Sequence, residues 1–186
     1  MKHPFWTMLI VFLPFFSFAQ NNLNFKPAPF GAINIGYSIV DELLPEGYFY
    51  NPQTLLGSID IWKRKYFSIY SELQFVHAYN SVDMKTDFEF GANLGLMFSM
   101  MVLKRLQVSA AIGSGPHYVT VQTTRQASGF IFSDNVEAGI TYEHLRTKTS
   151  YNLRVRFRHI SNAGLKAPNG GIDNLFLVLG MSILLD

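Results

Sequence analysis

Apolar and polar residues alternate with a period of two along much of the chain after residue 30. In the clearest stretch, residues 88–100, every even-numbered residue is apolar and the odd-numbered residues are mostly polar or glycine. Successive side chains of a strand point to opposite faces, so the pattern predicts β-strands whose two faces meet different environments.

Turn residues divide the pattern into eight segments, and we expect strands over residues 31–40, 53–62, 66–76, 88–100, 106–121, 130–142, 151–161 and 173–183. Their connections alternate between long loops at 41–52, 77–87, 123–128 and 162–171 and short turns at 63–65, 104–105 and 144–147. This alternation favours an all-β fold, an eight-stranded antiparallel up-and-down transmembrane β-barrel with its long loops outside the cell. A barrel of this size is filled by its own side chains, so no pore is expected.

The N-terminal segment indicates export. Lys2 and His3 precede an apolar run, and Ser17-Phe18-Ala19 supplies small residues for cleavage, so residues 1–19 are predicted to be a signal peptide and 20–186 the barrel domain. Cysteine is absent, which excludes a disulfide framework. The formal net charge of +2 points to no particular partner, and nucleic acid is not expected at the cell envelope.

Residues 151–161 carry the candidate chemistry. Odd-numbered residues from Tyr151 to Phe157 are apolar, whereas Arg154, Arg156 and Arg158 are polar, so the odd register puts His159 and Ser161 on the lipid-facing side. A hairpin symmetric about 162–171 sets Asp173 across from His159, facing outward as well. Inside the barrel, the same register logic sets Glu137 near Arg154.

Serine, histidine and an acid on one surface are the groups of a hydrolytic triad. Ser161 is expected to be the nucleophile, His159 the general base and Asp173 the carboxylate that orients the imidazole. Asn162, or backbone N–H groups around Ala163 and Gly164, are expected to form the oxyanion hole. Asp134, outward on the preceding strand, is the fallback acid.

The alternative is that His159 and Ser161 meet lipid headgroups at the membrane rim without any chemistry. The histidines elsewhere, His77, His117 and His144, lack ligand spacing, so no metal or other cofactor is expected.

The C-terminal stretch resembles the lipid A 3-O-deacylase family, the PagL-type and acyloxyacyl hydrolase-like outer-membrane esterases. The matching residues are His159-Ile160-Ser161-Asn162-Ala163-Gly164-Leu165-Lys166, Pro168-Asn169 and Gly171-Ile172. The resemblance implies a metal-independent Ser-His-Glu triad that cuts the 3-position acyl ester of lipid A, with an oxyanion role for Asn162. The family's glutamate falls on Asp173, which is one methylene shorter.

These observations predict an outer-membrane esterase that acts on lipid A or lipopolysaccharide in the outer leaflet, with a homodimer as an open possibility. One rival is a non-catalytic small outer-membrane barrel with a structural or adhesion role and a decayed triad. A second rival is a soluble periplasmic β-barrel that binds a lipid inside.

Overall fold

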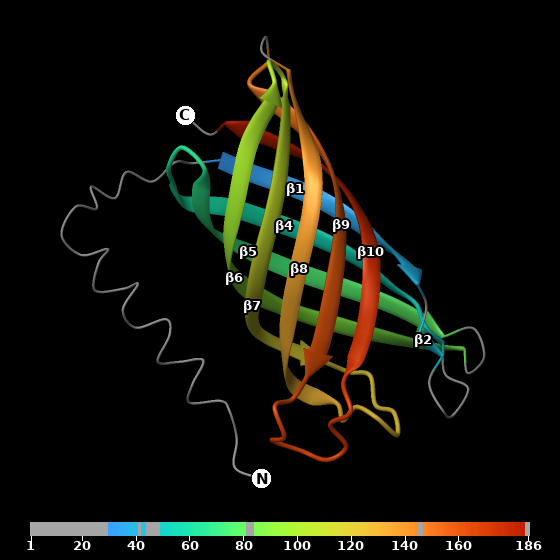
Figure 1. Cartoon of the computed structure of the whole chain (residues 1–186). Coiled ribbons are helices and arrows are strands. Elements are labelled where there is room, and N and C mark those ends of the chain that lie inside the picture. The colour runs from blue at the N-terminus through green and yellow to red at the C-terminus, as the bar shows by residue number, and fades with distance from the viewer. Residues whose placement is uncertain (1–29, 41, 44–48, 81–83, 145–146, 185–186) are drawn as a thin grey trace, which may run out of the picture.

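The computed structural model describes residues 30–40, 42–43, 49–80, 84–144 and 147–184. Within these residues eight strands pair into a closed antiparallel barrel (Figure 1). They are β1 (Phe30–Val40), β4 (Pro52–Lys63), β5 (Phe67–Asn80), β6 (Lys85–Leu103), β7 (Leu106–Val119), β8 (Gly129–His144), β9 (Thr149–Ser161) and β10 (Ile172–Leu184). Two short strands, β2 (Glu42–Leu43) and β3 (Phe49–Tyr50), form a separate sheet in the first loop. The predicted fold class is confirmed.

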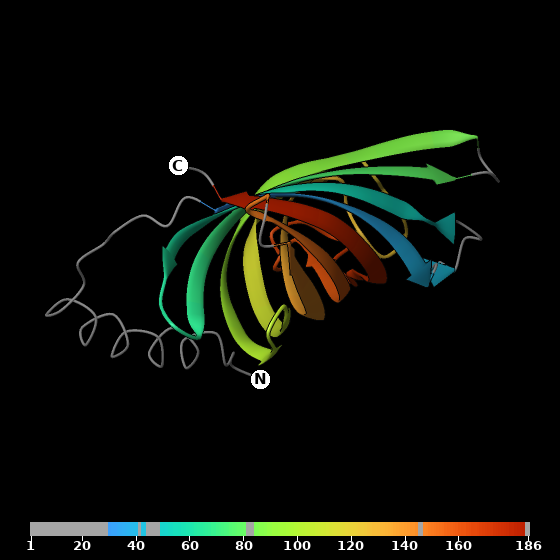
Figure 2. The ribbon, with the colours of Figure 1, turned by 90° about the horizontal axis from the view of Figure 1, so that it is seen from above.

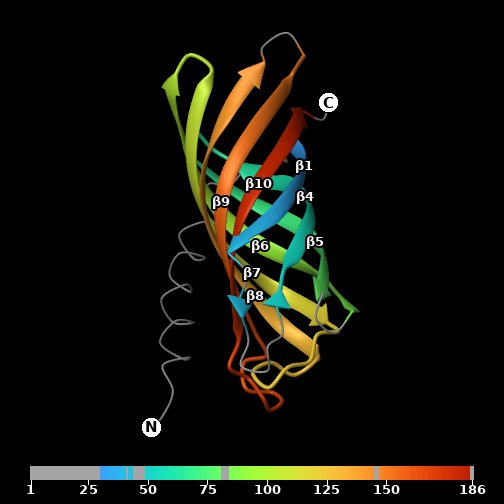
Figure 3. The same ribbon diagram turned by 90° about the vertical axis from the view of Figure 1, so that its right-hand side faces the viewer.

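Each barrel strand pairs with its neighbour in sequence, and β1 closes the ring by pairing with β10 from Phe30 opposite Leu184 onward. The start of β1 and the end of β10 therefore lie at the same end of the barrel as the short turns. The longer loops after β7 and β9 lie side by side at the opposite end (Figures 1 and 3). Figure 2 shows the strands curving around the lumen. The described residues contain no helix that is long and apolar enough to cross a membrane.

Side-chain direction follows the sequence pattern. Apolar residues such as Ile33 and Leu73 point outward and are 66% and 68% exposed, while polar residues such as Glu72 and Asn93 are buried inside. A closed barrel pairs its backbone groups between strands, so an apolar exterior around a polar interior is the arrangement that a bilayer requires.

Buried ion pairs fill the middle of the lumen. Arg156 donates from Nη1 and Nη2 to the Glu72 carboxylate across the barrel, at 2.7 Å each, and from Nε to Glu137 at 2.9 Å. Arg154 donates to Glu137 at 2.7 Å, which confirms the predicted proximity of these two residues. Because all four side chains are almost fully buried, each charge depends on its partners for stabilisation.

A second buried cluster lies nearer the long loops. Arg158 donates to both oxygens of Glu89 at 3.0 and 3.1 Å, and His117 Nδ1 lies 2.7 Å from the same carboxylate. Arg158 also donates to the Tyr50 hydroxyl at 3.3 Å and to Asn174 Oδ1 at 3.4 Å. Burial of Tyr50, in β3, raises the pKa of its phenol above the ordinary value. The cluster thus connects β6, β7, β9 and β10 to the first loop.

The prediction of a long loop at 77–87 is wrong. Strands β5 and β6 continue past the apolar alternation, with Tyr79 opposite Thr86, so the connection between them is residues 81–84. Polar residues interrupt the apolar alternation there, but the backbone groups of the two strands continue to pair. The pairing of β6 with β7 has the same register on both sides of Gly113–Pro116, so the two glycines and the proline in this stretch do not shift the strands.

The predicted signal peptide, residues 1–19, and the last two residues of the chain lie outside the described residues. Cleavage after Ala19 stays a prediction.

Candidate active site

The three predicted triad residues lie on the lipid-facing side at the loop end of β9 and β10. Asp173 is directly opposite His159 in the strand pairing, as the symmetric hairpin predicted. The side chains of His159 and Asp173 are 38% and 53% exposed, and Ser161 is half-buried. Their neighbours Arg158, Ile160 and Asn174 point inward. The outward orientation of this patch is therefore confirmed.

Asp173 and His159 are hydrogen-bonded. The distance from His159 Nδ1 to Asp173 Oδ1 is 2.6 Å. An ionised carboxylate can only accept, so Nδ1 carries the hydrogen and donates it. In a neutral ring this leaves the lone pair on Nε2, the state that a general base needs. The shorter side chain of aspartate, compared with the glutamate of the family, therefore still reaches the imidazole.

Ser161 lies two residues beyond His159 on the same face and across from Phe132 of β8. Among the described residues no hydrogen bond joins the Ser161 hydroxyl to the imidazole. Catalytic hydrogen bonds are often long before substrate binds, so the missing contact does not exclude the predicted roles of Ser161 and His159.

Asp134 is opposite His159 on the other side, on β8. Its Oδ1 accepts a hydrogen bond from Ser114 Oγ of β7 at 2.5 Å. Within the described part of the chain, the carboxylate bonded to His159 is Asp173, and Asp134 is engaged with Ser114.

Ser114 was missed by the sequence analysis. It is an exposed polar residue among the apolar outward residues of β7, and that break in the alternation was the available signal. Four adjacent strands thus carry an outward polar row, Ser114, Asp134, His159 and Asp173. Polar groups at membrane level are costly, which favours a functional explanation for this row.

The two residues expected to form the oxyanion hole are engaged within the loop after β9. Asn162 is buried; its Nδ2 donates to the Lys166 carbonyl at 2.6 Å, and its N–H donates to Asn169 Oδ1 at 2.7 Å. Its Oδ1 accepts from the Gly164 N–H at 3.0 Å. Ala163, between them, has an N–H without a partner among the described residues, and its φ is 53°. Of the expected donors, the Ala163 N–H is the one that is available in this conformation.

The loop after β7 supports the loop after β9. The Ala127 N–H donates to the Pro168 carbonyl at 3.0 Å, and the Gly170 N–H donates to the Arg125 carbonyl at 2.5 Å. Gln126 pairs with Asn169 and is fully buried. No pattern in the sequence indicated that these two loops would be hydrogen-bonded to each other.

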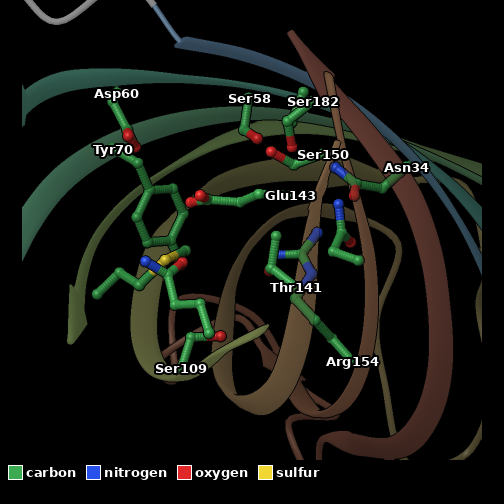
Figure 4. Close-up of a pocket in the computed structure, with 14 residues that line it drawn as sticks. Asn34, Ser58, Asp60, Tyr70, Ser109, Thr141, Glu143, Ser150, Arg154 and Ser182 are labelled. Carbon is green, nitrogen blue, oxygen red and sulfur yellow. The ribbon is translucent and has the colours of Figure 1, made fainter. Parts of the chain in front are cut away.

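A cavity inside the barrel lies away from the candidate triad. It has a volume of about 70 Å³ and lies at the turn end of the barrel, where Asn34, Asp60, Glu143 and Arg154 point into it (Figure 4). None of the triad residues lines it. In the described part of the chain no group of three or more His, Cys, Asp or Glu residues is arranged to hold a metal ion.

Comparison with known structures supports the class of protein. A crystal structure of the outer membrane enzyme PagL matches with a TM-score of 0.56 and 17% identity, covering 84% of this chain and 99% of that one. A crystal structure of Neisserial surface protein A (NspA) matches with a TM-score of 0.61 and 7% identity, covering 85% and 97%. At these identities the matches show the fold, that of a small outer-membrane β-barrel. No curated protein matches the sequence.

The family is indicated by the sequence itself. Residues 102–182 match the family model described as lipid A 3-O-deacylase (PagL). This segment includes every residue of the candidate site, from Asp134 to Asp173. The resemblance to the PagL-type family is therefore confirmed over this C-terminal segment.

Proposed function

We propose that the protein is an outer-membrane esterase that hydrolyses the 3-O-linked acyl ester of lipid A with Ser161, His159 and Asp173. The observation that carries the proposal is the 2.6 Å hydrogen bond between His159 Nδ1 and Asp173 Oδ1 on the lipid-facing surface. A structural barrel gains little from an orienting carboxylate on an outward histidine, whereas a general base depends on one.

In the proposed reaction the Ser161 hydroxyl oxygen attacks the ester carbonyl carbon, and its proton passes to His159 Nε2. The resulting oxyanion is stabilised by N–H donors at the start of the following loop, where the Ala163 N–H is available. Collapse of the intermediate releases the sugar 3-hydroxyl, which takes the proton from His159. Water then attacks the acyl-serine in the same way, releasing the fatty acid and restoring Ser161.

The place of the site on the barrel suits a lipid substrate. His159 and Ser161 lie at the loop end of β9, and Phe157 and Val155 continue the same outward face toward the middle of the barrel, 45% and 43% exposed. An acyl chain that lay along this face would keep its hydrocarbon in the bilayer and present its ester at the level of the polar row. The substrate thus needs no passage into the packed lumen.

The proton acceptor and the stabilising donors are all protein groups in this mechanism. We therefore propose that the reaction is metal-independent. We also propose that residues 1–19 direct export.

The test is the release of fatty acid from purified lipid A by the detergent-solubilised protein, with products identified by mass spectrometry. The parent protein should release the 3-O-linked acyl chain, and Ser161→Ala and His159→Ala should abolish release. Equal release by the substituted and parent proteins would rule out the proposed catalytic residues.

The non-catalytic barrel is the second candidate, favoured by the open contact between Ser161 and His159 and by the similarity in shape to NspA. It predicts that a correctly folded parent protein, judged by heat-modifiable mobility in gels, releases no fatty acid from lipid A.

A further inference from the structure

Gly171 lies beside the candidate triad and is the residue immediately before β10. The last pair in the β9–β10 ladder is Ile172 opposite Ile160, so continuing the register by one residue sets Gly171 across from Ser161. Its φ is +71°, in the left-handed region that favours glycine. Gly171 is buried, although the triad residues themselves are exposed or half-buried.

The imidazole of His159 occupies the space that a side chain at position 171 would need. A Cβ built on Gly171 would lie 2.5 Å from His159 Cε1, 3.0 Å from Nε2 and 3.1 Å from the Ile160 carbonyl oxygen. The carbonyl belongs to a paired strand and cannot retreat. An added methyl group would therefore push the ring away, and the edge displaced would be the one that bears Nε2.

Two contacts then define the position of the ring. Asp173 holds Nδ1 at 2.6 Å, and the adjoining edge, Cε1 and Nε2, fills the space beside Gly171 that a Cβ would take. Because Gly171 is across from Ser161, a ring that leans over it turns Nε2 toward the side of the nucleophile. We infer that Gly171 is a positioning residue, which keeps open the space where the proton-accepting edge of His159 sits. This inference rests on the proposed esterase function.

The test compares Gly171→Ala with Gly129→Ala. Gly129, at the start of β8, also has a positive φ, of 117°, but a Cβ there would meet nothing within 4 Å. Both variants carry the strain of an alanine in that region, and in Gly171→Ala the methyl group also collides with the ring. A displaced base can lower a rate on the order of 100-fold. We expect kcat for lipid A to fall by about that factor in Gly171→Ala, with KM little changed, and Gly129→Ala to stay near the parent.

The inference is overturned if folded Gly171→Ala keeps kcat within about threefold of the parent, or if Gly129→Ala loses as much; threefold is well below the loss expected of a misplaced base. A measurement on the unsubstituted protein in detergent micelles covers the case in which Gly171→Ala does not fold. A nuclear Overhauser effect between His159 Hε1 and the Gly171 Hα protons supports the placement, and its absence overturns it. A parent protein without activity defeats the proposed function instead, and the Overhauser measurement then decides the placement of the ring alone.

Discussion

Replacing Asp173 by asparagine tests the pairing on which the proposed mechanism depends. The amide is nearly the same size as the carboxylate, so β9 and β10 keep their register and the barrel keeps its packing. The change removes the negative charge that lies 2.6 Å from His159 Nδ1. The amide also has both a donor and an acceptor to turn toward the ring.

The two orientations of the amide bound the expected loss of rate. If the amide oxygen faces Nδ1, the imidazole keeps its tautomer and loses a charge-assisted hydrogen bond worth about 1.5–3 kcal/mol, which is roughly 10- to 150-fold in rate. If the NH2 group faces Nδ1, the ring proton moves to Nε2 and the base is lost, which in a serine protease costs about 10⁴-fold. We therefore expect kcat for lipid A to fall by between about 10-fold and 10⁴-fold.

Asp134→Asn is the matched control. This carboxylate is opposite His159 on the other neighbouring strand, but its hydrogen bond is to Ser114. The assay measures initial rates of fatty acid release from lipid A in detergent, with heat-modifiable mobility as the check on folding. Asp134→Asn should stay within a few-fold of the parent. A result in which Asp173→Asn keeps the parent rate, or Asp134→Asn is the more damaging change, would refute the assignment of the acid.

Three further predictions follow from other parts of the molecule. Glu72→Ala leaves Arg156 short of one buried partner and should lower the free energy of unfolding by about 3–5 kcal/mol, read from the urea midpoint in detergent; an unchanged midpoint contradicts this. Asn162→Ala removes the hydrogen bonds inside the loop after β9 and should speed trypsin cleavage after Lys166, whereas equal rates would show that Asn162 does not hold this loop. Chelators such as EDTA should leave the rate of fatty acid release unchanged, and a loss that added metal reverses would contradict the proposed metal independence.

The alternation of apolar and polar residues was sufficient to predict the barrel and the direction of its side chains. Hydrocarbon outside and packed polar groups inside impose a strict period of two, and a one-residue slip would turn the whole strand over. The orientation of His159, Ser161 and Asp173 followed from that rule, and the opposition of Asp173 to His159 followed from the hairpin.

The remaining features depend on contacts that the pattern does not encode. Glu137 was expected near Arg154 because adjacent strands carry them, but Glu72 reaches Arg156 from across the lumen, 84 residues away. The contact between the loops after β7 and β9 depends in the same way on distant residues, here Gln126 and Asn169. Strands β5 and β6 extend beyond the apolar alternation, where pairs such as Tyr79 and Thr86 no longer distinguish an outward from an inward face in the sequence.

The central claim is that the outward serine of β9 is an activated nucleophile. The most direct measurement is covalent labelling of the folded protein with a lipid-like fluorophosphonate, followed by peptide mass spectrometry. The account predicts one phosphonyl adduct, on Ser161, that disappears in His159→Ala while the barrel remains folded. Labelling at another residue, or no labelling of a protein that releases fatty acid from lipid A, would contradict it.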